Sequence, residues 1–579
     1  MIASLIQLLT GMAEASSLFL VAAGLTVIFG VTRVVNFAHG SLFMLGAYIG
    51  WSILSRMPRD PEYFALGVIL AGLATAAIGA ALEMTLLRRI YRAPELLQLL
   101  ATFGVVLMVQ DATLHLWGPE DLTLPRGRWL RSAVVILGER FPLYDLILIA
   151  LGPIVLAIIW MIFTRTRWGT LVRAATQDRD MVSALGVDQR RLFTSVFAMG
   201  SGLAGMAGAL ALPEASANLQ MDLTAITDAF VVVVIGGLGS ISGAYLAALL
   251  IGILQAVGII WLPKSTLVLV FVVMAAVLIV RPNGLRGRKL TAARGEADTI
   301  ASIKPASPSL KLAALATLAI AIAAPFVIGP FALSVLTEMA IAILFAASLH
   351  VMMGPGGMAS FGHAAWFGIG AYAAALPVKL LTVSMPIALL IAPIAAGMVA
   401  LAVGALVVRL NGVTLAMLTL AFAQIVWAVA FQWSDVTGGD NGILGVWPPS
   451  WAGPQAMYFL ALSLCAGGAL LLRKMLYAPW GFALRASRDS TQRAEAIGLD
   501  TQRLRLTAFT LVNPAPPLQP QLQHVAKHAL VPLLGPPKPP ARVVRQVVVS
   551  AQHKMPTTQL LWLDLHCHCT PSIQHTHPR

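Results

Sequence analysis

Charged residues are scarce in this 579-residue chain, and so are cysteines and nucleotide-binding glycine loops. Only 11% of the residues are Asp, Glu, Lys or Arg, whereas soluble domains carry about 25%, so a soluble globular protein is excluded. Three cysteines are too few for a disulfide scaffold. The sequence has no G-x-x-x-x-G-K-[ST] motif, which excludes ATP hydrolysis by that route. We therefore expect a chain that is not an enzyme and has no cofactor.

Long apolar runs are what the sequence has in abundance. The chain is 58% hydrophobic with a mean hydropathy of +0.82, and its runs reach about 20 residues, the length that an α-helix needs to cross a bilayer. The sequence predicts an all-α polytopic membrane protein in contact with lipid. The expected apolar segments are 8–30, 38–55, 64–87, 97–117, 143–163, 192–212, 226–260 (two crossings broken at Gly236–Gly239), 265–280, 311–328, 332–353, 361–380, 386–408, 413–432 and 456–473.

The net charge of +14 is explained by the loops between these runs. Arg and Lys gather in 164–191, 281–311 and 473–505, which the positive-inside rule assigns to the cytoplasm. Loops 213–228 and 433–455 contain acids without Lys or Arg and are assigned to the outside, whereas loop 118–140, with four Arg, is external only by the count of crossings. No nucleic-acid-binding motif is present, so we expect no nucleic-acid partner.

Two sequence blocks occur twice and in the same order. NFAHGSLFMLGAY (36–48) returns as SFGHAAWFGIGAY (360–372), with six of 13 positions identical, and 168–197 returns as 480–509, with 10 of 30 identical. The repeat predicts two homologous helical-bundle halves, because many transporters are built this way. The predicted organisation is a half at 1–280, a cytoplasmic linker at 281–310, a second, incomplete half at 311–512 and a Pro/His-rich tail at 513–579.

The first repeated block suggests a translocation pathway. It places a histidine at the start of an apolar, glycine-spaced segment in each half, and an ionisable residue in a membrane segment is a functional hypothesis. Alternatively, each histidine is buried and bonded to neighbouring backbone, where it holds a helix break in place. The glycine at 30 and the Gly-Pro-Gly-Gly run at 354–357 predict such breaks. The candidate pathway residues are Asn36, His39, Gly40, Ser360, Gly362 and His363.

The second repeated block predicts a surface helix on the cytoplasmic side. Its pattern indicates a short amphipathic helix that Gly186 or Gly498 ends, since glycine is a common helix stop. The helix is either a solvated connector or a docking site for a cytoplasmic partner. Two symmetry-related docking helices suggest a dimeric partner.

These blocks and several further motifs resemble the permeases of branched-chain amino acid ABC importers. In the first half, APELLQLLATFG (93–104), AFVVVVIGGLGSISGAYLAALLIG (229–252) and RPNGLRG (281–287) resemble the LivH type. In the second, RLNGVTLAMLTLAFAQIV (409–426) and TGGDNGI (437–443) resemble the LivM type. The resemblance identifies a LivH-type half fused to a truncated LivM-type half.

The resemblance implies a function, a location and partners. The chain would be a multi-pass permease subunit in the bacterial inner membrane that imports branched-chain, hydrophobic amino acids. Cytoplasmic ABC ATPase subunits, two by symmetry, would drive it, and a periplasmic amino-acid-binding protein would deliver the cargo. The coupling residues that the resemblance implies are Arg173, Ala174, Ala184, Gly186, Asp188, Arg485, Ala486, Ala496, Gly498 and Asp500.

The sequence after Val512 changes in character. These 67 residues hold 12 of the 34 Pro and 7 of the 11 His, and proline at this density does not continue a membrane helix. Either a frameshift has replaced the end of the second half or the tail is naturally disordered. His566, Cys567, His568 and Cys569 have the wrong spacing for a zinc finger, so no metal site is expected.

Two alternatives to an importer remain open. The fused chain could be a non-functional remnant of such a permease. It could instead be an ion-coupled secondary transporter, which predicts acidic residues inside the membrane segments; Asp111 and Glu338 are the clearest candidates.

Overall fold

The computed structural model describes residues 2–512, with gaps at 92, 94, 126, 128, 137, 288–306, 411, 447, 448, 450 and 451. Both repeated halves belong to one compact unit, Met1–Leu534. The predictions for the tail at 513–579, and for most of the linker at 281–310, lie outside the described residues.

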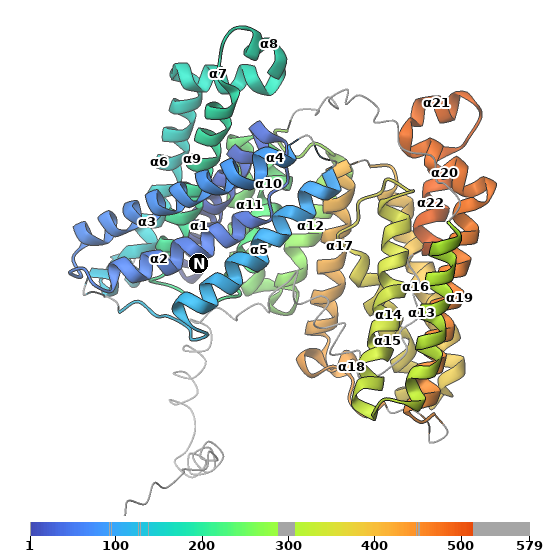
Figure 1. The fold of residues 1–579 in the computed structure, drawn as a ribbon. Coiled ribbons are helices and arrows are strands. Elements are labelled where there is room, and N and C mark those ends of the chain that lie inside the picture. Colours follow the sequence, from blue (N-terminus) through green and yellow to red (C-terminus); the bar gives the residue numbers. More distant parts are fainter. Residues whose placement is uncertain are drawn as a thin grey trace, which may run out of the picture. The chain divides into compact units, whose positions relative to one another are not determined.

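Helices dominate the described residues of both halves (Figure 1). The first half contains α1 (Ile2–Thr32), α2 (Ala38–Leu54), α3 (Pro61–Leu82), η1 (Glu83–Leu87), α4 (Arg88–Ile90), α5 (Glu95–Trp117), η2 (Trp129–Arg131), β1 (Ala133–Ile136), β2 (Glu139–Pro142), α6 (Leu143–Arg165), α7 (Arg167–Gln177), α8 (Arg179–Ala184), α9 (Gln189–Ala211), α10 (Met221–Gly236), α11 (Ile241–Trp261), η3 (Pro263–Ser265) and α12 (Thr266–Val280). The second contains α13 (Pro308–Ala323), η4 (Ala324–Phe326), α14 (Pro330–Met353), α15 (His363–Leu381), α16 (Met385–Val407), α17 (Gly412–Gln432), α18 (Ser434–Thr437), η5 (Gly439–Asn441), α19 (Pro454–Tyr477), α20 (Pro479–Asp489), α21 (Thr491–Ala496) and α22 (Thr501–Val512).

Most of the predicted membrane helices are confirmed, but the first of the two crossings predicted in 226–260 is not: α10 has 16 residues and is not among the helices that are long and apolar enough to span a bilayer. Twelve helical segments of the described residues are long and apolar enough to cross a bilayer, and α2 and α12 are shorter apolar helices. The only β-sheet found in the described ranges is the antiparallel hairpin of β1 and β2, in the loop between α5 and α6. The all-α polytopic fold class is therefore correct.

The structure tests three predicted helix breaks, which concern α1, α10 and α14. The predicted break between α10 and α11 is present, and Gly237 and Gly239 there have φ of 102° and 80°, values that only glycine adopts easily. The break after α14 at 354–362 is also present. The predicted break at Gly30 is wrong: α1 continues to Thr32, and the chain turns at Arg33, whose φ is 57°.

Small residues on α9 allow neighbouring helices to approach closely. A methyl group on Gly205 would collide with Thr75 of α3, and one on Gly208 would collide with the Phe43 backbone of α2. Close approach at small residues is how membrane helices gain contact energy, since lipid supplies no hydrophobic driving force between them. α9 is thus the central helix of the first half.

A buried carboxylate ties α3 to α9. The Glu83 side chain is only 1% exposed and accepts bonds from the Arg88 guanidinium at 3.1 Å and from the Thr194 hydroxyl at 2.6 Å. It begins η1, a single turn of π-helix, and such turns frequently occur at functional positions. No sequence pattern predicts this contact, because Glu83 is 111 positions from Thr194.

The α9 packing generates a stability prediction. We expect Gly208→Ala to destabilise the protein by about 1–3 kcal/mol, because the added methyl group meets rigid backbone rather than a movable side chain. Gly104→Ala is the matched control, since a methyl group there meets nothing within 4 Å. Thermal unfolding in detergent measures both, and equal melting temperatures for the two variants would contradict the role of α9.

Candidate functional site

The predicted surface element occurs in both halves, but it is two helices rather than one. α7 and α8 form it in the first half, and α20 and α21 in the second. The helix breaks at Asp178 and at Ser490, where φ is −144° and −161°. Each side chain there accepts a bond from the backbone N–H three residues later, at 2.9 and 3.3 Å, so a new helix begins with its own N-cap.

The glycine and aspartate of each coupling motif shape the backbone. Gly186 and Gly498 have φ of 80° and 86°. The N–H of each glycine donates to the carbonyl three residues earlier, and the N–H of the following residue donates to the carbonyl five residues before it, at 2.9–3.3 Å. This pair of bonds is a Schellman helix stop. Asp188 and Asp500 then cap α9 and α22, and each pairs with an Arg three residues later, at 3.2 and 2.9 Å. These four residues hold the element in shape.

An indole hydrogen bond anchors each element to the following helix. Trp168 donates to the Ser195 hydroxyl at 2.8 Å, and Trp480 donates to the Thr507 hydroxyl at 3.1 Å. Each pair spans 27 residues, and the two pairs occupy equivalent repeat positions. The repeat therefore extends to contacts that sequence identity alone does not reveal, because Ser and Thr differ.

The tip of each element exposes a large apolar side chain. Leu185 and Ile497 are equivalent, and both are 75% exposed. The sequence analysis missed them, although an apolar residue between the shared Ala and Gly of both motifs was a usable signal. Of the other predicted residues, Arg173, Ala184 and Ala496 are exposed, whereas Ala174, Arg485 and Ala486 are half-buried.

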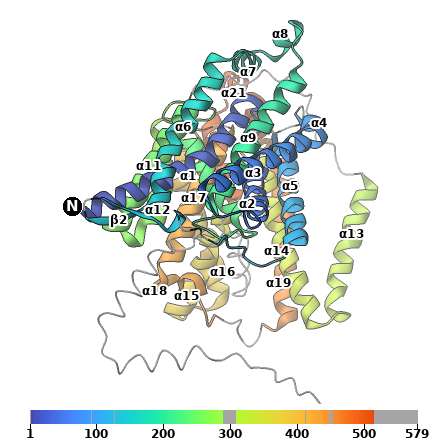
Figure 2. The same cartoon turned by 90° about the vertical axis from the view of Figure 1, so that its left-hand side faces the viewer.

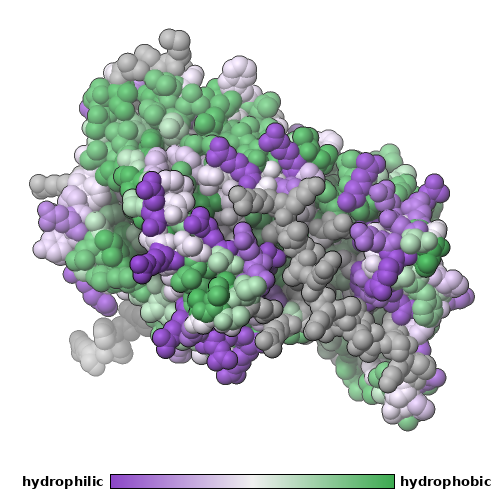
Figure 3. Space-filling model, turned by 90° about the horizontal axis from the view of Figure 1, so that it is seen from above, coloured by the Kyte–Doolittle hydropathy of each residue, from purple (hydrophilic) through white to green (hydrophobic). Residues whose placement is uncertain are grey.

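Both tips lie at the same end of the described structure. α7, α8 and α21 project beyond the long helices at the top of Figure 1, and α8 also projects at the top of Figure 2. Seen from this end, hydrophilic residues extend across the middle of the face to its lower and right edges, and hydrophobic residues lie mainly along its upper edge (Figure 3). A hydrophilic face of this kind is one that meets water rather than lipid.

Arginine bonds connect each element to the helix break before the histidine block. In the first half, Arg33 donates to the Thr176 carbonyl at 3.0 Å, and Arg179 donates to the Thr32 carbonyl at 3.1 Å. In the second, Arg488 donates to the Gly354 carbonyl at 2.8 Å. Both breaks are thus tied to the surface elements by charged hydrogen bonds, which are among the stronger ones.

The two block histidines contact the preceding helix of their own half. His39 is fully buried, and its Nε2 lies 2.9 Å from the Val21 carbonyl of α1. His363 is 4% exposed, and its Nε2 lies 2.7 Å from the Ser348 hydroxyl of α14. The His39 contact is a backbone bond of the kind expected of a histidine that holds a break in place, whereas His363 bonds a side-chain hydroxyl; both roles stay predictions.

The other four pathway candidates are also buried or closely packed. Asn36 accepts a bond from the Ala38 N–H at 3.1 Å, and its repeat equivalent Ser360 is 4% exposed. A methyl group on Gly40 would collide with the Asp222 carbonyl, and one on Gly362 with the Thr419 carbonyl. The two glycines therefore allow close helix contact.

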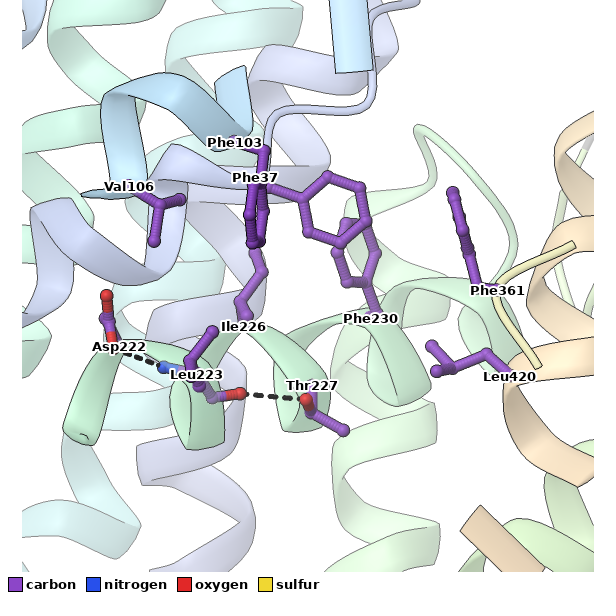
Figure 4. Close-up of a pocket in the computed structure, with 10 residues that line it drawn as sticks. All are labelled: Phe37, Phe103, Val106, Asp222, Leu223, Ile226, Thr227, Phe230, Phe361 and Leu420. Carbon is purple, nitrogen blue, oxygen red and sulfur yellow. Dashed lines mark hydrogen bonds between the residues drawn. The ribbon is translucent and has the colours of Figure 1, made fainter. Parts of the chain in front are cut away.

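Phe37 and Phe361, which lie among these candidates in the sequence, are the residues of the block that line a pocket. Phe37 and Phe361 line one narrow pocket with about 20 Å³ of space, roughly enough for one water molecule, and none of the six predicted residues lines it (Figure 4). Their rings meet edge to face, with centroids 5.4 Å apart. The two halves thus touch at equivalent residues, and α12 of the first half also packs against α17 of the second.

The pocket walls are aromatic and aliphatic, with one carboxylate at the edge. Asp222 is 1% exposed and accepts bonds from the Gln110 amide at 3.0 and 3.1 Å and from the Ser41 hydroxyl at 3.2 Å. No salt bridge to it is found among the described residues. The sequence analysis named neither Asp222 nor Glu83 as an acid inside the bundle. The full lining is Phe37, Phe103, Val106, Asp222, Leu223, Ile226, Thr227, Phe230, Phe361 and Leu420.

Comparisons with known proteins identify the family. The sequence model of the branched-chain amino acid transport system permease component matches residues 7–280 and 331–512. The high-affinity branched-chain amino acid permease protein LivH of Escherichia coli K12 is 30% identical over 303 residues, 49% of this chain and 95% of that protein. LivH of Salmonella typhimurium LT2 is 27% identical over 292 residues, with the same coverage.

A second type of relative also matches. LivM of Escherichia coli K12 is 27% identical over 261 residues, which is 40% of this chain and 61% of that protein. No solved structure matches the chain. The chain is a multi-pass membrane protein that belongs to the permease family of the branched-chain amino acid transport system, with LivH-type and LivM-type sequence in one polypeptide.

Proposed function

We propose that the chain forms the translocation pathway of an ATP-driven importer for branched-chain amino acids, and that α7–α8 and α20–α21 dock a separate ATPase. The observation that carries this proposal is the recurrence of one capped surface element with an exposed apolar tip. A single exposed apolar side chain is common on protein surfaces, but here one that is 75% exposed recurs at equivalent tip positions of both halves. Two such tips suit a partner that presents two equivalent surfaces.

The pocket supports an apolar cargo. Nine of its ten lining residues are apolar or Thr, which suits the side chain of a hydrophobic amino acid better than a polar solute. It lies where the halves meet, which is where repeat-built transporters bind their substrates. A periplasmic binding protein would deliver the amino acid to the end opposite the tips, and the membrane would be the bacterial inner membrane.

The ion-coupled alternative gains little from the structure. Asp111 and Glu338, the acids that would serve it, are both exposed on their helices rather than enclosed between helices. Buried acids do exist: Glu83 is paired with Arg88, and Asp222, which has no such pair among the described residues, is bonded by the Gln110 amide and the Ser41 hydroxyl. Family membership also favours a permease that is driven by a separate ATPase.

Charge at the tips tests the docking proposal. We expect Leu185→Asp and Ile497→Asp each to weaken ATPase binding at least about tenfold, because an unpaired carboxylate buried in an interface costs more than 1.4 kcal/mol. The measurement is co-purification of the ATPase with the tagged chain, together with uptake of labelled leucine by cells.

Leu262→Asp is the matched control for the tip variants. Leu262 is 52% exposed between α11 and η3, at a connection that the crossing count assigns to the outside. Its substitution should leave ATPase binding unchanged. If it weakens binding as much as Leu185→Asp does, the tips are not the docking site.

Competition tests the cargo. Uptake of labelled leucine by cells that express the chain with its ATPase and binding protein should fall when unlabelled isoleucine or valine is added in excess. Urea and acetamide should not compete, because the pocket has few polar groups to bind them. Inhibition by urea but not by valine would assign the permease to another substrate.

A further inference from the structure

We infer that Phe37 and Phe361 together form the gate of the pathway, and that the surface elements open it through Arg179 and Arg488. This inference rests on the proposed function and goes beyond it, because it names the residues that close the path and the bonds that move them. Three observations carry it: the symmetry of the pair, its position in the chain breaks, and the bonds from those breaks to the tips.

The pair is symmetric across the two halves. Phe37 and Phe361 occupy the same position of the repeated block, and their rings meet at 5.4 Å with an interplanar angle of 86°. Two equivalent residues meet each other only near the pseudo-symmetry axis that relates the halves. A pathway between the halves of a repeat-built transporter runs along that region.

The exposure of the pair distinguishes it from ordinary core aromatics. Both rings are partly exposed and line the pocket, whereas the core aromatics Phe19 and Trp366 are 0% and 1% exposed. Figure 4 shows the Phe37 ring against that of Phe230, with Phe361 to their right, above the helix that carries Asp222. Apolar rings that narrow a path exclude water and solutes by dewetting until they separate.

The backbone at both positions can move without unwinding a helix. Phe37 ends the non-helical segment between α1 and α2, and Phe361 lies in the segment between α14 and α15. Rotation about a few dihedral angles there shifts each ring, whereas a residue within a helix moves only with the whole helix. Short segments of this kind are where hinges usually lie.

The first-half break is tied directly to the docking element. Arg179, the first residue of α8, donates to the Thr32 carbonyl at 3.1 Å, five residues before Phe37. Arg33 donates back to the Thr176 carbonyl of α7 at 3.0 Å. A displacement of α8 by a docked partner therefore pulls on the segment that carries Phe37.

The second-half break is tied in the same way by a different residue. Arg488 of α20 donates to the Gly354 carbonyl at 2.8 Å, and a methyl group on Gly357 would collide with the Arg488 side chain. Gly357 has a φ of 62°, so the glycine both makes the turn and leaves room for the aliphatic part of the Arg488 side chain. The surface element of each half thus holds the segment that carries its own gate residue.

A leak assay tests the gate. The purified full chain, without any ATPase, is placed in vesicles loaded with labelled leucine or with labelled urea. Phe37→Ala and Phe361→Ala should each speed efflux about two- to tenfold over the unsubstituted chain, which is the factor that one aromatic pair contact supplies. Phe361→Leu should leak less than Phe361→Ala, because it keeps an apolar plug.

Phe19→Ala is the matched control for the leak assay. Phe19 makes an equivalent edge-to-face contact with Tyr245, at 5.1 Å, within the first half. Its loss removes a buried ring without opening the interface between the halves, so it should cause no leak. If both gate variants elute as folded protein and leak no faster than Phe19→Ala, the gate is overturned.

Cross-linking tests the link between gate and transport. Phe37→Cys and Phe361→Cys are combined in a chain whose three native cysteines are Ser, and a short bifunctional methanethiosulfonate joins them. Uptake driven by the ATPase should stop after cross-linking, return after reduction, and be unaffected in each single-Cys variant. Continued uptake by the cross-linked protein would overturn the inference.

Arg488→Ala and Arg179→Ala test the mechanical connection. Each should lower leucine uptake several-fold while ATP hydrolysis by the bound ATPase continues, because the movement of the ATPase would no longer displace the gate residues. Parallel loss of hydrolysis and uptake would contradict this connection. A complex whose unsubstituted chain takes up no leucine, but whose gate variants leak, would refute the proposed cargo and leave the gate standing.

Discussion

Backbone N–H and C=O groups inside a bilayer have no water to bond, so every interruption of a membrane helix must be covered by protein that satisfies it. The breaks in this chain meet that demand. The Leu285 N–H bonds to the Ile235 carbonyl at 2.8 Å after α10, and the Phe361 N–H bonds to the Thr419 hydroxyl at 3.1 Å. Because broken backbone is costly at these depths, its location restricts where the pathway can run.

That constraint links the two ends of the proposed mechanism. The segments before α2 and α15 are covered on one side by their own half and are bonded to the surface elements through arginine. On their other side they carry the phenylalanines that meet across the halves. One short segment in each half therefore contacts both the surface element at which the ATPase would dock and the phenylalanine pair between which the cargo would pass.

The two halves preserve geometry more strictly than they preserve sequence. The first half caps α8 with Asp178, and the second caps α21 with Ser490. The anchoring indole donates to Ser195 in the first half and to Thr507 in the second. Side-chain oxygens of either kind accept or donate at the same place, so the role survives the substitution. The surface element is therefore defined by its caps and its anchor, and the exposed tip is the part left free to meet a partner.

The sequence by itself determined the membrane class, the helices, the repeat and the family resemblance, because hydrophobic length, loop charge and glycine position act locally along the chain. The helix stop at Gly186 was predictable for the same reason, although the new helix start at Asp178 was not, since it depends on one side-chain bond. Only the tertiary structure brought Glu83 to Thr194 and Phe37 to Phe361. Contacts between residues separated by more than 100 positions depend on how whole helices pack, and no local pattern encodes that arrangement.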